Sequence, residues 1–196
     1  MAQKLLITGF EPFGKEAVNP SWEAVRLLPD RIGRMDITRL LVPTVFGLAT
    51  ETVLAKAAEL QPDAILCVGQ AGGRAAVTPE VIGINLREAS IPDNAGRQPL
   101  GEPVAENGPA AYFATLPVRD MAQAIRAANL PGALSYSAGA FVCNDLLYGL
   151  LHHYDGTPVR VGFVHVPFLP QQARDGVPSL PLEDIVRALT AAIGAL

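Results

Sequence analysis

Strand-like and helix-like segments alternate along almost the whole chain, and this alternation restricts the possible folds more than any other feature. Lys4–Thr8 and Ala64–Val68 are short apolar runs typical of buried strands. Between them, Thr44–Leu60 has apolar residues close to helical spacing. Such alternation favours a mainly parallel sheet with helices on both faces. We therefore predict an α/β fold: a single-domain α/β/α sandwich with a mainly parallel twisted sheet, spanning residues 1–196.

The remaining elements follow from the same kind of pattern. Asn19 suits the cap of a helix that carries Pro20 in its first turn. A stretch rich in Pro, Gly and Asn, Ile91–Gly108, is expected to be a long loop. The other predicted strands are Asp36–Val42, Val81–Arg87, Gly132–Ser137 and Val159–Val166, and the other predicted helices are Asn19–Leu28, Val118–Asn129, Asn144–Tyr154 and Leu182–Leu196.

Composition excludes several classes of protein. A net charge of −4, with Lys and Arg scattered along the chain, leaves no basic patch for nucleic acid. The N-terminal apolar run is too short for a signal peptide, and the uncharged stretch Ala127–Asn144 contains Pro, Gly and hydroxyl residues that do not suit a membrane span. The two cysteines lie in different local settings and do not suggest a disulfide framework. We therefore expect a cytoplasmic protein without nucleic-acid or membrane partners.

Residues that can carry chemistry gather where the predicted strands end. Gly9-Phe10, Gly69-Gln70, Cys143 and His165 fall at the carboxyl ends of strands, where open α/β sheets bind ligands. Cys143 also stands at the start of a helix, where free N–H groups and the helix dipole favour a thiolate. The small residues 137–140 before it let backbone N–H groups approach a substrate. A thiol and an imidazole in such places point to a Cys-His nucleophilic enzyme.

Simpler interpretations account for the other candidates. Cys67 lies inside a strand and is expected to be a buried, inert thiol. His152 and His153 fall in the last turn of a helix, where they complement the dipole, so His165 is the better base. The glycine cluster 69–73 matches no nucleotide-binding motif, and no group of residues has zinc spacing. Spacing alone does not select the acid that would orient the imidazole from among Glu11, Glu80, Glu88, Asp93 and Asp145.

Nine blocks of sequence, in order, resemble the pyroglutamyl peptidase I family of cysteine peptidases over nearly the whole length. These blocks are Leu6–Gly14, Val18–Val25, Val42–Phe46, Cys67–Arg74, Thr78–Glu80, Ile91–Asn94, Ser137–Gly139, Phe141–Asn144 and His165–Pro167. The resemblance implies an α/β/α sandwich, a cytoplasmic homo-oligomer that is often a tetramer, and no cofactor or metal.

The resemblance also implies the site and the reaction. The family's Cys-His-Glu triad falls on Cys143, His165 and Glu80, and the implied substrate slot consists of Phe10, Phe13, Asn19, Gln70, Phe141 and Val142. The implied activity is removal of an N-terminal pyroglutamyl residue from peptides through a thioester acyl-enzyme. Two alternatives keep the fold: hydrolysis of a different small acyl-amide by the same triad, and a family member that only binds its ligand.

Two positions near the site depart from the usual residues of the family. Ser90 stands where members commonly carry an arginine, and Arg87 is a candidate to replace that cation. Asp145 stands where a histidine is usual, two residues after the nucleophile. A carboxylate there opposes thiolate formation unless it points away or pairs with a cation.

Overall fold

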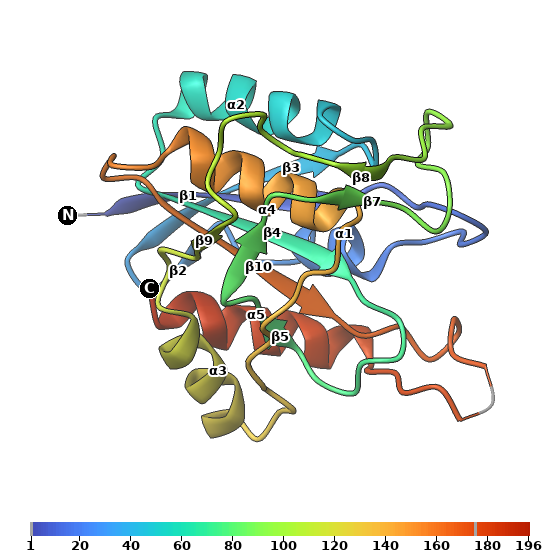
Figure 1. Cartoon of the computed structure of the whole chain (residues 1–196). Helices are drawn as coiled ribbons and strands as arrows, with labels where there is room; N and C mark the ends of the chain where they lie inside the picture. The colour runs from blue at the N-terminus through green and yellow to red at the C-terminus, as the bar shows by residue number, and fades with distance from the viewer. Residues whose placement is uncertain (1, 175) are drawn as a thin grey trace.

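The computed structural model describes residues 2–174 and 176–196, and its centre is a six-stranded sheet in the order β2-β3-β1-β4-β10-β5 (Figure 1). Strands β3, β1, β4 and β10 run parallel, whereas the short edge strands β2 and β5 pair antiparallel with their neighbours. The strands are β1 (Gln3–Phe10), β2 (Arg31–Ile32), β3 (Met35–Val42), β4 (Ala64–Gln70), β5 (Thr78–Pro79) and β10 (Arg160–Val166).

Helices cover both faces of this sheet, as Figure 1 shows. One face carries α1 (Pro20–Val25), α3 (Val118–Ala127) and α5 (Leu182–Gly194), and the other carries α2 (Leu48–Leu60) and α4 (Val142–His153). Because successive side chains of a strand point to opposite faces, Leu5 and Ile7 of β1 join the first core and Leu6 joins the second. The predicted α/β/α sandwich is confirmed.

The predicted strand Val81–Arg87 is wrong as a member of the central sheet. The segment forms two short strands, β6 (Ile82–Ile84) and β7 (Arg87–Glu88), which pair with β9 (Ala111–Phe113) and β8 (Leu100–Glu102) in separate ribbons. The side chain of Asn144 also holds the segment, through hydrogen bonds with Ile84 N, Ile84 O and Leu86 O, all 2.9 Å long. This clamp comes from α4, so the local alternation could not reveal it.

Two other predicted boundaries also need correction. Gly132–Ser137 makes only isolated bridges, one of which joins Ser135 to Glu80, instead of a strand. The helix expected from Thr44 begins at Leu48, because Gly47 has a φ of 77° and ends the helical conformation. As a result, Thr44 lies in a loop above the sheet. The helix expected from Asn144 starts slightly earlier, at Val142, which places Cys143 inside its first turn.

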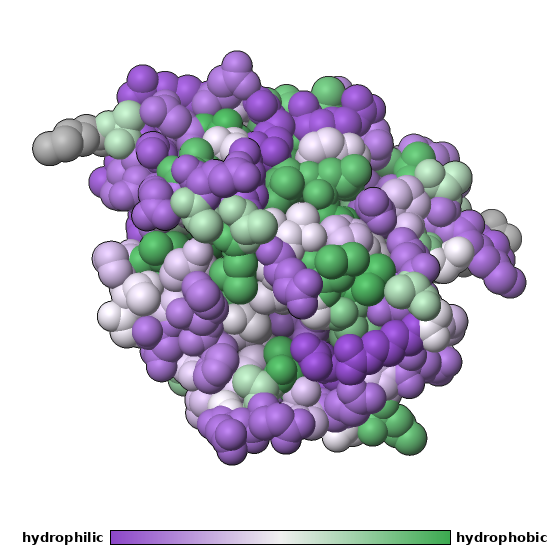
Figure 2. Space-filling view, turned by 90° about the horizontal axis from the view of Figure 1, so that it is seen from above, coloured by the Kyte–Doolittle hydropathy of each residue, from purple (hydrophilic) through white to green (hydrophobic). Residues whose placement is uncertain are grey.

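The surface is mixed in character. The face over α2, seen in Figure 2, is largely hydrophilic, with small groups of apolar residues near its centre. Among the described residues, no helix combines the length and the apolarity needed to cross a membrane.

Candidate active site

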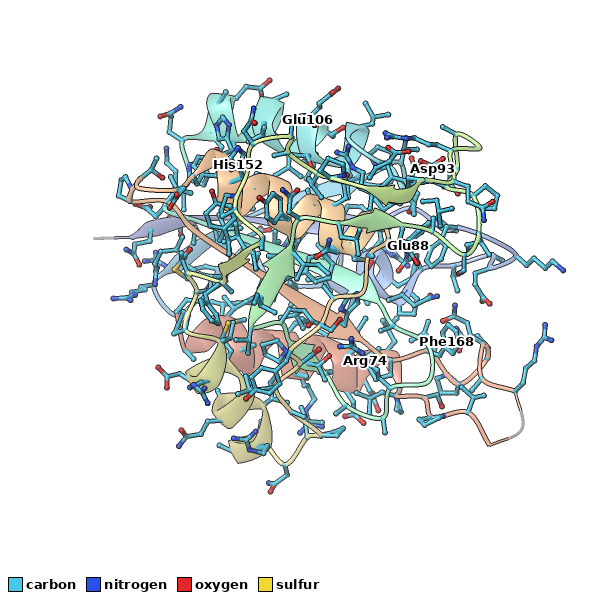
Figure 3. All side chains as sticks on the ribbon, viewed as in Figure 1. Arg74, Glu88, Asp93, Glu106, His152 and Phe168 are labelled. Atoms are coloured by element: carbon cyan, nitrogen blue, oxygen red, sulfur yellow. The ribbon has the colours of Figure 1, made fainter. Side chains whose placement is uncertain are left out.

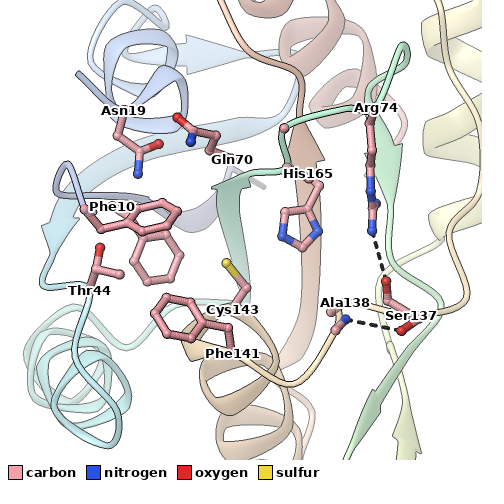
Figure 4. A pocket seen from close by; sticks show the side chains of 14 residues that line it. Phe10, Asn19, Thr44, Gln70, Arg74, Ser137, Ala138, Phe141, Cys143 and His165 are labelled. Carbon is pink, nitrogen blue, oxygen red and sulfur yellow. Dashed lines mark hydrogen bonds between the residues drawn. The ribbon is translucent and has the colours of Figure 1, made fainter. Parts of the chain in front are cut away.

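Cys143 opens onto a cavity of about 360 Å³ at the carboxyl end of the sheet (Figure 4). Cys143 lies two residues after Phe141, which is the N-cap of α4. Because the side chain of Phe141 makes no capping hydrogen bond, the first N–H groups of the helix stay available beside the thiol. A Cβ on Gly69 would lie 2.9 Å from Cys143 Sγ. The absence of a side chain at Gly69 therefore leaves the room that the thiol occupies.

His165 is the second group of the site, and Glu80 is the third. His165 lies near the end of β10 and is 3% exposed, and its Nδ1 is 2.7 Å from Oε1 of the fully buried Glu80. Thr78 of β5 pairs with His165 in the sheet, which brings Glu80, just after β5, beside the imidazole. With Nδ1 donating to the carboxylate, Nε2 remains free to accept a proton. Both Cys143 and His165 line the cavity.

The other acids that spacing left open have different places. Asp93 is buried and accepts hydrogen bonds from the N–H groups of Phe46, Ala95 and Arg97, which holds the loop after β7. Figure 3 labels it together with Glu88 of β7. Neither these acids nor Glu11 or Asp145 makes a hydrogen bond or ion pair with His165 within the described part of the chain.

Arg74 is a functional residue that we did not single out from the sequence. Its guanidinium donates to Glu80 Oε1 at 2.6 Å and to Thr78 Oγ1 at 2.6 Å. It also donates to the carbonyl of Ser137 at 3.0 Å (Figure 4). It therefore ties the acid of the site to the loop that leads to the nucleophile. An arginine at the end of a glycine cluster was the available signal, but its partners are distant in sequence.

Burial governs the protonation of the three groups. Burial opposes ionisation of Glu80, and yet the hydrogen bonds from His165 and Arg74 hold the pKa of Glu80 below its usual value. Burial lowers the pKa of His165 in spite of the neighbouring Glu80. Burial, reinforced by the charge of Glu80, raises the pKa of the Cys143 thiol to about 12. For the thiol, burial thus opposes the helix start, which favours the thiolate.

Aromatic side chains form one end of the cavity. Phe13 and Phe141 pack with ring centroids 5.8 Å apart, and Phe46 meets Phe141 edge-on at 5.2 Å. Phe10 lies beside Asn19 and Thr44 in the same region (Figure 4). Such a slot suits a flat, neutral ring.

Asn19 lines the cavity while its side chain is already occupied. Its Oδ1 accepts from the N–H of Ser21 at 3.1 Å, and its Nδ2 donates to the carbonyl of Glu11 at 3.0 Å. The predicted helix cap is confirmed. Beside its main chain, Asn19 can therefore offer a substrate only the second N–H of its Nδ2.

The structure brings five of the six expected slot residues to the cavity and leaves out Val142. The Val142 side chain is fully buried in the core beneath α4, because its position on the helix turns it toward the sheet. The cavity is lined by Phe10, Phe13, Asn19, Thr44, Gln70, Ala71, Gly72, Arg74, Ser137, Ala138, Gly139, Phe141, Cys143 and His165.

Asp145 points away from the nucleophile. Its fully buried carboxylate lies 2.5 Å from Arg87 Nε and accepts the N–H of Gly47 at 2.7 Å. Arg87 is thereby engaged outside the cavity, and Ser90 is exposed and does not line the cavity either. Neither residue supplies a cation to the site. Among residues 2–174 and 176–196, no three His, Cys, Asp or Glu side chains are grouped so that they could hold a metal ion.

Comparison with known proteins agrees with this geometry. The family model described as pyroglutamyl peptidase matches residues 3–196. The pyrrolidone-carboxylate peptidase of Levilactobacillus brevis is 53% identical over 197 residues, covering 98% of this chain and 97% of the relative. The protein of the same name from Bacillus subtilis is 50% identical over 193 residues, covering 96% of this chain and 90% of the relative.

Solved structures show the same likeness. The crystal structure of pyroglutamyl peptidase I from Bacillus amyloliquefaciens superposes with a TM-score of 0.95 at 47% identity, covering 98% of this chain and 96% of that one. The pyrrolidone carboxyl peptidase from Thermococcus litoralis superposes with a TM-score of 0.93 at 35% identity, covering 98% and 92%. The likeness extends over the whole length in sequence and in fold, and the chain belongs to the pyroglutamyl peptidase family.

Proposed function

We propose that this chain is a cysteine exopeptidase that hydrolyses the amide bond after an N-terminal pyroglutamyl residue of a peptide. Cys143 is the nucleophile, His165 the acid and base, and Glu80 the group that orients the imidazole. The observation that carries the proposal is a thiol and an imidazole in one cavity, with the other imidazole nitrogen held by a buried carboxylate.

The first half of the reaction forms a thioester. The Sγ–H proton of Cys143 passes to His165 Nε2 as Sγ attacks the carbonyl carbon that follows the lactam ring. The oxyanion is stabilised by the free N–H groups at the start of α4. The tetrahedral intermediate collapses, the C–N bond breaks, and the departing amine takes the proton from His165.

The second half returns the enzyme to its starting state. His165 Nε2 takes a proton from water, whose oxygen attacks the thioester carbonyl. The C–S bond breaks, pyroglutamate leaves, and the thiol regains its proton. Throughout, Glu80 keeps Nδ1 protonated and stabilises the transient imidazolium.

The slot explains the choice of ring. Phe10, Phe13 and Phe141 enclose a flat apolar ring, and the neutral side chain of Gln70 and the main chain of Asn19 supply polar groups without an ion pair. A prolyl residue has the same ring size but a charged amine and no lactam carbonyl, so the slot should reject it.

Turnover of pyroglutamyl-naphthylamide, compared with the prolyl and glutaminyl analogues, tests the proposal. Cys143→Ala should abolish turnover with the fold intact. Cys67→Ala, which alters the other cysteine in the buried strand β4, is the matched control and should stay active. Equal rates on the pyroglutamyl and prolyl substrates would instead favour hydrolysis of a different acyl-amide, and an inactive wild type would favour a binding protein.

The proposal extends to assembly and location. From the family resemblance we expect a cytoplasmic homo-oligomer, with a tetramer as the expected size. Exposed apolar side chains, among them Leu100, Phe113 and Tyr136 at 81%, 70% and 64% exposure, support association between copies of the chain. Light scattering coupled to size-exclusion chromatography measures the oligomer size, and a monomer at all concentrations would contradict this part.

A further inference from the structure

Gln172 joins three distant segments of the chain beside the cavity, although it does not line the cavity itself. It lies in the loop that follows β10. Its Oε1 accepts the N–H of Leu169 at 3.0 Å. Its Nε2 carries two hydrogens and has three acceptors within hydrogen-bond distance, so two of them share one N–H: Glu16 Oε2 at 2.9 Å, Gln70 Oε1 at 3.1 Å and the carbonyl of Val18 at 3.2 Å.

The orientation of the Gln172 amide is settled by groups whose roles are unambiguous. A backbone N–H can only donate, so the atom of Gln172 that faces Leu169 is the oxygen. A carboxylate and a backbone carbonyl only accept, so the atom that faces Glu16 and Val18 is the nitrogen. Turning this amide over would break all three contacts.

This orientation in turn determines the orientation of Gln70. Because Gln172 presents a donor, the Gln70 atom in contact with it must be the acceptor Oε1. Gln70 Nε2 is then the remaining polar atom of that side chain, and it has no hydrogen-bond partner within residues 2–174 and 176–196. Gln70 lines the cavity, and its amide lies with Asn19 and Phe10 at the end away from Arg74 (Figure 4).

We propose that Gln172 is a positioning residue for substrate specificity: it orients the Gln70 amide so that the cavity offers an N–H to the carbonyl of a lactam ring. The inference rests on the proposed function, since it assigns the lactam to this end of the cavity. A free glutamine could present either its oxygen or its nitrogen and would not discriminate between an acceptor and a donor on the ring. With Gln172 in place, only a ring that carries an acceptor is matched.

Two substitutions perturb the orientation in different ways. Gln172→Glu keeps the acceptor for Leu169 but removes the donor, so that Gln70 gains by turning its Nε2 toward position 172 and its oxygen toward the cavity. Gln172→Met removes both functions, introduces no charge, and leaves Gln70 free to turn. Combining Gln172→Glu with Glu16→Gln relieves the carboxylate repulsion while keeping the reversed orientation. Gln171→Glu, at the exposed neighbouring residue, is the matched control for the change of charge.

The decisive readout is the inhibition of pyroglutamyl-naphthylamide turnover by 2-pyrrolidone and by pyrrolidine-2-thione. The two rings have nearly the same shape and the same N–H, but the thiocarbonyl is a much poorer acceptor. Wild type and Gln171→Glu should bind the lactam about tenfold more tightly, the factor that one neutral hydrogen bond supports. The ratio should fall below about threefold in the Gln172 variants, with KM for the substrate raised more than kcat is lowered. A general distortion of the pocket would weaken both inhibitors equally and leave the ratio unchanged.

The outcomes separate this inference from the proposed function. A wild type that hydrolyses the pyroglutamyl substrate, together with Gln172 variants that keep the wild-type inhibitor ratio, overturns the role of Gln172 and leaves the proposed function intact. A wild type that binds 2-pyrrolidone and pyrrolidine-2-thione equally well also overturns the role of Gln172. A wild type without turnover refutes the proposed function itself. Thermal unfolding of each variant identifies any that does not fold, and Gln172→Met then carries the test in place of Gln172→Glu.

Discussion

The buried ion pair between Asp145 and Arg87 should stabilise the fold without taking part in the chemistry. Asp145 is fully buried, Arg87 has a side chain that is 16% exposed, and the pair is joined at 2.5 Å. Removing one partner leaves the other charge uncompensated, which typically costs about 3–5 kcal/mol. Asp145→Asn retains an acceptor for Gly47, so we expect the lower end, about 3 kcal/mol. In a chain of 196 residues this lowers Tm by roughly 6–12 °C.

A double-mutant cycle measures the pair by urea unfolding. Arg87→Met strands the Asp145 carboxylate and should cost at least as much as Asp145→Asn. The double variant removes both charges, so its cost should be lower than the sum of the two single costs by about 2 kcal/mol or more. Additivity within about 0.5 kcal/mol would refute the idea that these residues stabilise each other.

The same variants test whether Asp145 opposes the nucleophile. Burial, Glu80 and Cys67 raise the pKa of the Cys143 thiol and Arg74 lowers it, whereas Asp145 has no part in this shift. We therefore expect kcat/KM of Asp145→Asn to stay within about threefold of wild type under conditions where the variant is folded. A change of more than about tenfold would show that the carboxylate acts on the thiol after all.

Three further predictions concern the site. Gly69→Ala places a Cβ 2.7 Å from Phe163 Cζ and 2.9 Å from Cys143 Sγ. We therefore expect turnover assays to give a kcat about 100-fold lower, and urea unfolding to give a stability about 1–3 kcal/mol lower. A wild-type kcat would contradict the close approach. The pKa values of His165 and Glu80 are both lowered in the folded protein, so the unfolded chain binds more protons. The free energy of unfolding should therefore decline as pH falls below about 6.5, and further below about 4.5. His165→Gln should reduce the decline that begins below about 6.5, measured by urea titrations at several pH values. Iodoacetamide should inactivate the enzyme by alkylating Cys143, whereas EDTA should leave turnover unchanged. A loss of activity on chelation that zinc restores would contradict the mechanism.

Periodicity predicted the fold where each strand buries both of its faces. Lys4–Thr8 and Ala64–Val68 correspond to β1 and β4 because burial on both faces leaves an uninterrupted apolar run. The single strand predicted for Val81–Arg87 is instead split into β6 and β7, which pair outside the central sheet and are also held by the side chain of Asn144. No local pattern records a clamp that comes from 60 residues away.

The candidate site, like the fold, could be predicted from the sequence only in part. His165 could be identified because it stands near the end of β10, at the edge of the parallel sheet where such folds bind ligands, and Cys143 because it stands at the start of a helix. The acid stayed open among five residues, because Glu80 reaches His165 through an antiparallel edge strand that is only two residues long. The resemblance to a known family assigned the acid before the structure showed its hydrogen bond.

The layered α/β architecture could be predicted from the sequence because burial and chain direction leave periodic marks in the order of residues, and the same reasoning pointed to Cys143 and His165 as nucleophile and base. The burial of the Val142 side chain and the pairing of Asp145 with Arg87 follow only from the tertiary structure. It also decided the network through Gln172 that turns the Gln70 amide. These features depend on desolvation and on hydrogen bonds between residues far apart in the chain, and such contacts exist only once the segments have packed together.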